Sequence, residues 1–310
     1  MARLQVCTSA LELIGETPLL HLRSYDRPDA AQIFAKLEFL SPGGSVKDRT
    51  ALGLIQDAEK RGLLRPGSTI IEPTAGNTGI ALALIAAQRG YKTILVVPEK
   101  YSREKRTLMR ALGAEVVVTP TEAGIQGAME RAHSIAAVTP GAFMPQQFEN
   151  PANPDIHYRT TGREIWQQMQ GRIDALVLGA GTGGTFTGVS RYVKERRPAV
   201  VAILVESEGS VLGGGSAAPH KVEGIGNSFF PKTLDRALVD EVIAVGDRDA
   251  FRTSGELARR EGLLVGGSAG AIAFAAARVA QRLGPGRRVA TLFPDTAERY
   301  LSQGIYDEVT

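Results

Sequence analysis

The segment DALVLGAGTGGTFTG, Asp174–Gly188, joins a short apolar run to a glycine-rich turn and then to the beginning of a helical pattern. Gly179, Gly181 and Gly184 satisfy G-x-G-x-x-G, the pattern of a dinucleotide-binding turn. Such a site also has an acidic residue about twenty positions further on, and Glu206 stands there, at the end of VVAILVE. The segment therefore predicts a phosphate-binding strand, turn and helix. It leaves open whether the phosphate belongs to NAD or to another ligand.

The overall composition is that of a globular protein with one large or two modest domains: 310 residues, 43% hydrophobic and 22% charged. The formal net charge is only +3, and no basic run is interleaved with aromatic residues, so nucleic-acid binding is disfavoured. No apolar run reaches membrane-spanning length, and the N-terminus lacks a signal-peptide core. We therefore expect a cytoplasmic protein that binds small molecules rather than nucleic acid or a membrane.

Cysteine and histidine usage disfavours disulfide and metal chemistry. Cys7 is the single cysteine of the sequence, which fits a reducing compartment. The histidines lack the spacing of metal ligands, so we expect no metal site and structural or solvent-facing roles for His21, His133, His157 and His220.

Short apolar runs rich in β-branched residues alternate with amphipathic stretches along most of the chain. Continuous apolar runs are typical of strands buried on both faces, and the alternation is typical of parallel sheets with right-handed crossovers. The predicted strands are Ile33–Glu38, Ser68–Glu72, Lys92–Val97, Ala114–Thr119, Ile173–Gly179, Val200–Glu206 and Arg287–Phe293. The predicted helices are Ser45–Arg61, Asn77–Arg89, Ser102–Leu112, Glu122–Ala136, Tyr158–Met169, Gly184–Glu195, Asp247–Glu261 and Ser268–Leu283.

The pattern occurs twice, which predicts an α/β fold with two lobes, each a mostly parallel twisted sheet with helices on both faces. Residues 43–150 would form a smaller N-terminal lobe, and residues 1–42 plus 151–310 a larger one. FMPQQFENPANPD, Phe143–Asp155, is rich in proline and asparagine and is interpreted as the crossing between them. The long glycine-rich loop Gly209–Lys232 in the second lobe has the length of a functional or mobile loop.

SPGGSVKDR is the first of four segments with chemical character. Ser45 and Asp48 resemble a capping box, which predicts that a helix begins at Ser45 and places Lys47 in its first turn. The positive helix terminus and a dry site would both lower the pKa of Lys47. A neutral amine is what a Schiff-base lysine requires; a solvated lysine beside Asp48 is the alternative.

PTAGNTG, residues 73–79, follows the strand that ends at Glu72. Backbone N–H groups at such a turn bind an anion, and Thr74, Asn77 and Thr78 add side-chain donors. A phosphate or a carboxylate would suit this turn; a plain turn with Asn77 as the helix cap is the alternative.

Two further glycine-rich turns precede helices. GAGTGGTFTG contains Thr182 and Thr185 but lacks the lysine of a Walker motif. GGSAG places Ser268 at the start of a helix, where its hydroxyl would either cap the helix or contact a polar ring atom of a ligand. An NAD-binding fold accounts for the first turn but not for Lys47, PTAGNTG or GGSAG. Anion-binding turns in both lobes indicate a ligand with two anionic ends, such as an amino acid joined to a phosphorylated ring.

Taken together, the motifs resemble the cysteine synthase and cystathionine β-synthase family of pyridoxal-phosphate (PLP) enzymes. They occur in family order across nearly the whole chain: GGSVKDR, EPTAGNTGIALA, GAGTGGTFTGVSRYVKE, VEGIGNSFFPKTLD and GLLVGGSAGA. The resemblance implies the tryptophan-synthase-β fold, PLP fold type II, and a homodimer. The mixture of motifs is most similar to the bacterial O-acetylserine-dependent cystathionine β-synthase type.

The resemblance also implies roles for individual residues. Lys47 matches the lysine that binds PLP covalently and acts as the catalytic base, Asn77 the residue that hydrogen-bonds the ring hydroxyl, and Ser268 the residue that faces the pyridine nitrogen. The phosphate cradle matches Gly181, Thr182, Gly183, Gly184 and Thr185. The substrate-binding residues match Thr74, Ala75, Gly76, Thr78, Gln147 and Gly224. On this interpretation the phosphate is that of PLP, and Glu206 is a chance match or has a local role.

The implied reaction is β-replacement on an activated serine, with O-acetylserine favoured over serine or O-phosphoserine. Sulfide would give cysteine and homocysteine would give cystathionine, and the motifs do not decide between them. Glu223 is a candidate for contacting the amino group of homocysteine, or else a solvated loop carboxylate. Ala75 stands where the family usually has serine, which removes one hydroxyl from the carboxylate loop.

Other functions stay open at this point. A serine or threonine dehydratase shares the fold type and would release its intermediate to water. An NAD-dependent oxidoreductase and a catalytically inactive binding protein are the alternatives from other classes. The tail of a serine acetyltransferase is a candidate partner that the sequence does not reveal.

Overall fold

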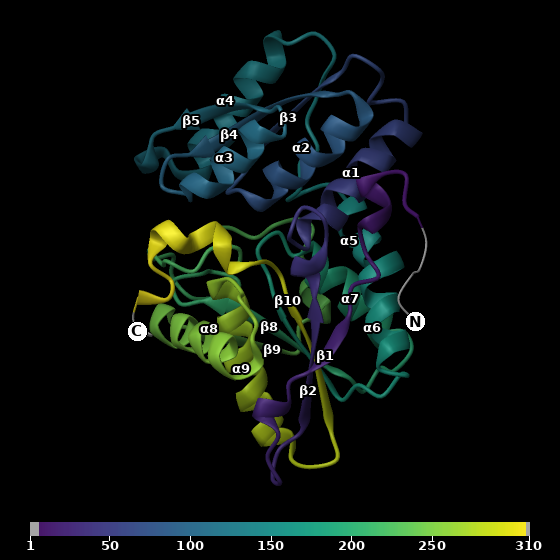
Figure 1. The fold of residues 1–310 in the computed structure, drawn as a ribbon, viewed down its shortest axis with the longest axis vertical. Helices are drawn as coiled ribbons and strands as arrows, with labels where there is room; N and C mark the ends of the chain where they lie inside the picture. Colours follow the sequence, from purple (N-terminus) through teal and green to yellow (C-terminus); the bar gives the residue numbers. More distant parts are fainter. Residues whose placement is uncertain (1–5, 308–310) are drawn as a thin grey trace.

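The computed structural model describes residues 6–307 as an α/β fold with two sheets. In Figure 1 the four-stranded sheet with helices α2, α3 and α4 lies above the six-stranded sheet, and α1 lies between them. Among residues 6–307, no helix is long and apolar enough to cross a membrane.

The six-stranded sheet has the order β1-β2-β10-β7-β8-β9 and is parallel except for the antiparallel edge strand β1. Strand β2, near the N-terminus, pairs with β10, near the C-terminus, in a register from Gln32↔Arg288 to Leu37↔Phe293. Its strands are β1 Leu19–His21, β2 Gln32–Leu37, β7 Ala175–Gly179, β8 Val201–Ser207, β9 Glu241–Val245 and β10 Arg288–Phe293.

The four-stranded sheet is parallel throughout and has the order β5-β4-β3-β6. Its strands are β3 Thr69–Pro73, β4 Lys92–Pro98, β5 Glu115–Thr119 and β6 Ala142–Phe143.

Helices cover both faces of each sheet. The helices are α1 Lys47–Lys60, α2 Asn77–Arg89, α3 Arg103–Ala111, α4 Gly124–Val138, α5 Ala152–His157, α6 Arg163–Gln168, α7 Gly184–Lys194, α8 Asp247–Glu261 and α9 Gly267–Leu283. A π-helical turn, η5 Tyr158–Gly162, joins α5 to α6. Short 3-10 turns are η1 Ala10–Leu13, η2 Arg23–Tyr25, η3 Glu38–Leu40, η4 Thr121–Ala123, η6 Arg236–Leu238 and η7 Ala297–Gln303.

The apolar cores lie between these layers. On one face of the large sheet, α8 and α9 bury residues such as Leu257 and Ile272, and on the other α6 and α7 bury Ile165 and Phe186. The small sheet is packed against α1 and α2 on one face and against Ala128 and Ala132 of α4 on the other. This arrangement confirms the predicted fold class of parallel sheets with helices on both faces. The lobe boundaries at residues 43 and 150 stay a prediction.

The strands that the sequence pattern failed to predict are β1, β6 and β9. All three lie at a sheet edge, and most of their residues are half-buried. Strands β1 and β6 have only three and two residues, too few to form a recognisable apolar run. Strand β9, EVIAV, does contain a short apolar run, and the prediction was wrong to omit it.

Three predicted helix starts were wrong by two residues or more. Helix α4 begins at Gly124 rather than at Glu122, after the 3-10 turn η4. Helix α1 begins at Lys47 and has no side-chain cap, because its N-cap residue is Val46, which has no hydrogen-bonding side chain. Asp48 does not reach back to Ser45 as a capping box requires; it accepts from the Gly43 amide at 2.6 Å and so closes the preceding turn. The helix predicted from Tyr158 starts six residues earlier, at Ala152. Proline is tolerated in a first helical turn, where its missing N–H has no partner to lose. The end of the proline-rich segment is therefore helix rather than crossing.

Candidate active site

The predicted motifs meet at the carboxyl ends of the parallel strands. PTAGNTG follows β3, and the GAGTGG turn follows β7. Pro294 follows β10 and accepts a hydrogen bond from the Val46 amide at 2.8 Å, which brings Lys47 to the same edge. Ligands of open α/β sheets bind at this edge, where several loops converge.

Lys47 is the first residue of α1 and is half-buried. It lines one small cavity together with Val46, Gly181, Thr182, Gly183, Thr185 and Gly224. Burial lowers the pKa of its amine, the Asp295 carboxylate opposes this shift, and the Lys105 ammonium adds to it. The structure thus places a lysine with a lowered pKa beside the predicted phosphate cradle.

The cradle is the turn before α7. Gly183 has a φ of +85°, and a Cβ at Gly181 would lie 2.5 Å from the Gly224 carbonyl oxygen, so glycine is required at both positions. Thr182 Oγ1 accepts a hydrogen bond from the side-chain amide of Asn153 at 3.1 Å. The first backbone N–H groups of α7 have no carbonyl partner within the helix, and this positive helix terminus suits a phosphate dianion without a lysine in the turn. The residues present therefore fit the phosphate of PLP.

His157, which has a structural role as expected, also touches this cradle. It is fully buried, and its ring nitrogens lie 3.2 Å from Thr185 Oγ1, 3.0 Å from Thr50 Oγ1 and 2.9 Å from Thr161 Oγ1. Burial and the nearby Arg49 and Lys47 cations hold its pKa well below the ordinary value. A neutral imidazole therefore orients the Thr185 hydroxyl.

Glu206 has a local role. It is buried at the end of β8, and its Oε1 accepts from the Gly213 amide at 3.1 Å. Glu206 thus holds the long glycine-rich loop. It is therefore not the acidic residue that an NAD site would use to bind the ribose.

The PTAGNTG turn is organised by its own hydroxyl groups. Thr74 Oγ1 accepts from the amides of Gly76 and Gly79 at 3.0 and 3.2 Å, and Thr78 donates to Gln147 Oε1 at 2.6 Å. The small side chain of Ala75 leaves its place half-exposed. The structure therefore brings Thr74, Ala75, Gly76, Thr78 and Gln147 together, as predicted from the family motif.

Glu72, in strand β3, holds the segment that carries Gln147 beside this turn. Its carboxylate accepts from the Gln146 and Gln147 amides at 3.0 and 3.1 Å, which fixes Gln146 at a φ of +56°. Burial raises the pKa of Glu72 to about 7, against the effect of the two amides. In the sequence Glu72 is recognisable only as the end of a strand, and the signal for a further role is an acidic residue that closes an apolar run.

Asn77 begins α2 and is bound by two residues that the sequence pattern did not reveal. Its Nδ2 donates to Asp295 Oδ2 at 2.6 Å, and its Oδ1 accepts from Arg299 Nη1 at 2.7 Å. Asp295 lies two residues after the end of β10, and Arg299 lies in η7; neither belongs to a local motif that connects it to Asn77.

Ser268 and Gly224 face each other across the site. Ser268 is buried in the first turn of α9, and a Cβ at Gly224 would lie 3.9 Å from its hydroxyl oxygen. Gly224 itself has a φ of +92°. The glycine at this position therefore brings the loop backbone close to the serine.

Glu223 is not the solvated carboxylate that was one of its two interpretations. It forms an ion pair with the buried Lys105 of α3, and its other oxygen accepts from Gln303 Nε2 at 2.6 Å. The Lys105 ammonium also lies 4.0 Å from the centre of the Tyr300 ring. This cluster joins the small sheet's α3 to the glycine-rich loop and to η7.

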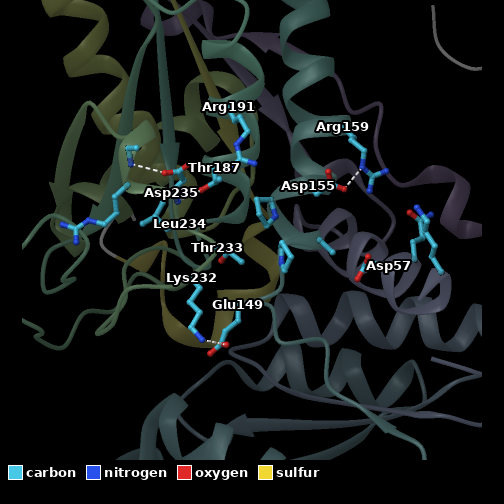
Figure 2. A pocket seen from close by; sticks show the side chains of 17 residues that line it. Asp57, Glu149, Asp155, Arg159, Thr187, Arg191, Lys232, Thr233, Leu234 and Asp235 are labelled. Atoms are coloured by element: carbon cyan, nitrogen blue, oxygen red, sulfur yellow. Dashed lines mark hydrogen bonds and ion pairs between the residues drawn. The ribbon is translucent and has the colours of Figure 1, made fainter. Parts of the chain in front are cut away.

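A larger pocket of about 1240 Å³ lies apart from these residues, between α1, α5, α7 and residues 232–237. Figure 2 shows the ion pairs on its wall, Lys232 with Glu149 and Arg159 with Asp155. None of the predicted site residues lines it, so its size alone does not mark it as the active site. Within residues 6–307, no group of histidine, cysteine, aspartate and glutamate side chains is arranged to hold a metal ion.

Comparison with known proteins agrees with this geometry. The family model "Pyridoxal-phosphate dependent enzyme" matches residues 10–295. An O-acetylserine dependent cystathionine beta-synthase of Bacillus subtilis (strain 168) is 46% identical over 302 residues, 97% of this chain and 98% of the relative. A cysteine synthase of Helicobacter pylori is 48% identical over 305 residues, 98% and 100% of the two chains.

Solved structures give the same result. The crystal structure of an O-acetylserine dependent cystathionine beta-synthase from Helicobacter pylori superposes with a TM-score of 0.94 at 48% identity, covering 97% of this chain and 99% of that one. That of an O-ureido-L-serine synthase gives 0.94 at 40% identity, covering 99% and 97%. The chain therefore belongs to the pyridoxal-phosphate dependent enzymes of fold type II, in the cysteine synthase and cystathionine β-synthase family.

The raised pKa of Glu72 predicts a pH dependence of stability. A carboxyl group with a raised folded-state pKa stabilises the fold below its ordinary pKa of 4.5, and this contribution is lost as the pH rises to about 7. The wild-type free energy of unfolding should therefore fall by about 3 kcal/mol more than that of Glu72→Gln between pH 4.5 and 8. Urea unfolding of both proteins across this range checks the difference; parallel curves would contradict it.

Proposed function

We propose that this protein catalyses PLP-dependent β-replacement on O-acetylserine with a sulfur nucleophile, either sulfide to give cysteine or homocysteine to give cystathionine. The observation that carries the proposal is the shared cavity of Lys47, the phosphate cradle and Gly224. The activities named for the Bacillus and Helicobacter relatives support the choice of donor and nucleophile.

In this proposal Lys47 holds the cofactor and then moves a proton. Lys47 would hold the cofactor, and its amine, when not bound to the cofactor, would take the α-proton of the substrate and later return it. Because burial lowers its pKa, a larger share of the amine is neutral and able to act as a base near neutral pH. When bound, PLP supplies the sink for the electrons left at the α-carbon.

The remaining residues bind and orient. Gly181, Thr182, Gly183, Gly184 and Thr185 would hold the phosphate, Asn77 the ring hydroxyl and Ser268 the pyridine nitrogen. A serine at that nitrogen does not enforce its protonation, which suits elimination at the β-carbon and disfavours transamination.

The substrate carboxylate would be held by Thr74, Ala75, Gly76, Thr78 and Gln147. The turn at the start of α2 offers backbone N–H groups, so it retains donors although Ala75 lacks a hydroxyl. Gly224 would contact the bound substrate from the opposite loop. Glu223, turned toward Lys105, would exchange part of this pairing for the amino group of homocysteine.

The family resemblance supports further proposals. We infer that the protein is a homodimer that acts in the cytoplasm, with lobes at residues 43–150 and at 1–42 plus 151–310. The tail of a serine acetyltransferase is a candidate partner on the same grounds.

Replacing the lysine tests the assignment of its role. Lys47→Ala should lower β-replacement turnover by at least about a hundredfold, since it removes both the cofactor's covalent attachment and the base. Lys60→Ala, at the exposed end of the same helix, is the matched control and should keep full turnover. Cysteine or cystathionine formation is measured for both. Substantial activity in Lys47→Ala would show that another group is the base.

Replacing the loop glutamate tests the nucleophile. Glu223→Gln should raise the KM for homocysteine about tenfold and change the KM for sulfide far less, because sulfide has no amino group to bind. Glu104→Gln is the control, since Glu104 also joins α3 to η7, through Ser302 at 2.8 Å, but is not adjacent to a residue that lines the cavity, as Glu223 is to Gly224. Equal losses with both nucleophiles would count against a role of Glu223 in specificity.

A further inference from the structure

The segment after β10 contacts three of the four motif segments, although none of the motif residues belongs to it. The Val46 amide donates to the Pro294 carbonyl at 2.8 Å, and the Gly266 amide donates to the Asp295 carbonyl at 3.2 Å. The Asp295 side chain accepts a hydrogen bond from the side-chain amide of Asn77 at 2.6 Å. The lysine, serine and asparagine loops are thus joined through one short stretch of chain.

Asn77 is held at both ends of its side-chain amide. A carboxylate such as Asp295 only accepts hydrogen bonds, and the guanidinium of Arg299 only donates them. The two contacts, 2.6 and 2.7 Å long, therefore allow one orientation of the amide, with Nδ2 toward Asp295 and Oδ1 toward Arg299. One hydrogen of Nδ2 is left to donate elsewhere.

Asp295 and Arg299 are themselves fixed and buried. Both side chains are at most 5% exposed. The Tyr300 hydroxyl donates to Asp295, and Arg299 Nη2 donates to the Gly43 carbonyl. Burial and the Asp295 and Glu223 carboxylates raise the pKa of Tyr300 well above its ordinary value, so its hydroxyl stays a donor.

Two glycines of the motif loops leave space for these side chains. A Cβ at Gly266 would lie 2.5 Å from Asp295 Oδ1, and one at Gly44 would lie 2.5 Å from Arg299 Nη2. Glycine at these positions thus leaves the space that the Asp295 and Arg299 side chains occupy.

We propose that Asp295 and Arg299 are positioning residues that fix the side-chain amide of Asn77 so that its remaining N–H group donates to the ring hydroxyl of the cofactor. The inference rests on the proposed function, because it takes Asn77 as the residue that contacts that hydroxyl. Neither residue touches the cofactor in this account. Both act through Asn77, and Asp295→Asn, which removes the charge but keeps an acceptor, separates this role from the effect of the Asp295 carboxylate on the pKa of Lys47.

A double-mutant cycle tests the proposal. The apo forms of the wild type, Asn77→Ala, Asp295→Ala and the double variant are titrated with PLP, and the dissociation constant is obtained from the absorption of the bound cofactor. Asn77→Ala and Asp295→Ala should each raise the dissociation constant about tenfold, and the double variant should resemble Asn77→Ala alone. Asp295→Asn, which keeps an acceptor oxygen, should restore most of the affinity.

Asp174→Ala is the matched control for a general loss of stability. Asp174 also accepts from a backbone amide, that of Arg288 at 2.9 Å, and from the Arg197 guanidinium, but it precedes β7 at the opposite end of the sheet. Thermal unfolding of the apo-proteins should show a loss for both aspartate variants, with a weaker cofactor affinity for Asp295→Ala alone. Should Asp295→Ala not fold, Arg299→Lys takes its place in the cycle, because lysine cannot bridge Asn77 and Gly43 as the guanidinium fork does.

The outcomes separate the inference from the proposed function. A dissociation constant raised about a hundredfold in the double variant would mean that the two substitutions act independently. That result, or an unchanged affinity in Asp295→Ala, would overturn the positioning role while leaving the role of Asn77 intact. An unchanged affinity in Asn77→Ala would contradict the site assignment itself, and the inference with it.

Discussion

The hydrogen bond from the Val46 amide to the Pro294 carbonyl, 2.8 Å long, connects the start of α1 to the end of β10. Because Lys47 is the next residue, this contact sets the place of the lysine relative to the large sheet. The same sheet carries the phosphate cradle after β7 and is continuous with β10 through the pairing of Thr291 with Val177. The distance between the lysine and the cradle is thus governed by a rigid parallel sheet rather than by flexible loops.

The first turn of α1 is fixed to the large sheet by buried charges. Arg49 donates to Glu38 at 2.7 Å and to Glu164 at 2.6 Å, and Lys36 lies 2.8 Å from Glu164. Arg49 and Lys36 together hold the pKa of Glu164 at about 2, despite its burial. A buried charge cluster of this kind contributes little net stability, but it allows few alternative arrangements of the helix. The lysine is therefore held from both sides of its position in the chain.

The sequence allowed the fold class and most motif residues to be predicted because their signals are local. Central strands are continuous apolar runs, and the turns before α2, α7 and α9 are rich in glycine. Asp295 and Arg299 could not be found in this way, since their partner Asn77 lies 218 and 222 residues away in the chain. Glu72 was visible as a residue, but its role depends on the amides of a loop 74 and 75 residues away. Likewise, the ion pair of Glu223 with Lys105 arises only when α3 packs against the glycine-rich loop.

The visible absorption spectrum of the purified protein tests the central claim most directly. The account predicts a yellow protein whose absorption band shifts when O-acetylserine is added and returns when sulfide or homocysteine follows. The nucleophile that restores the band faster would identify the physiological reaction. A protein that stays colourless after PLP is supplied would contradict the account.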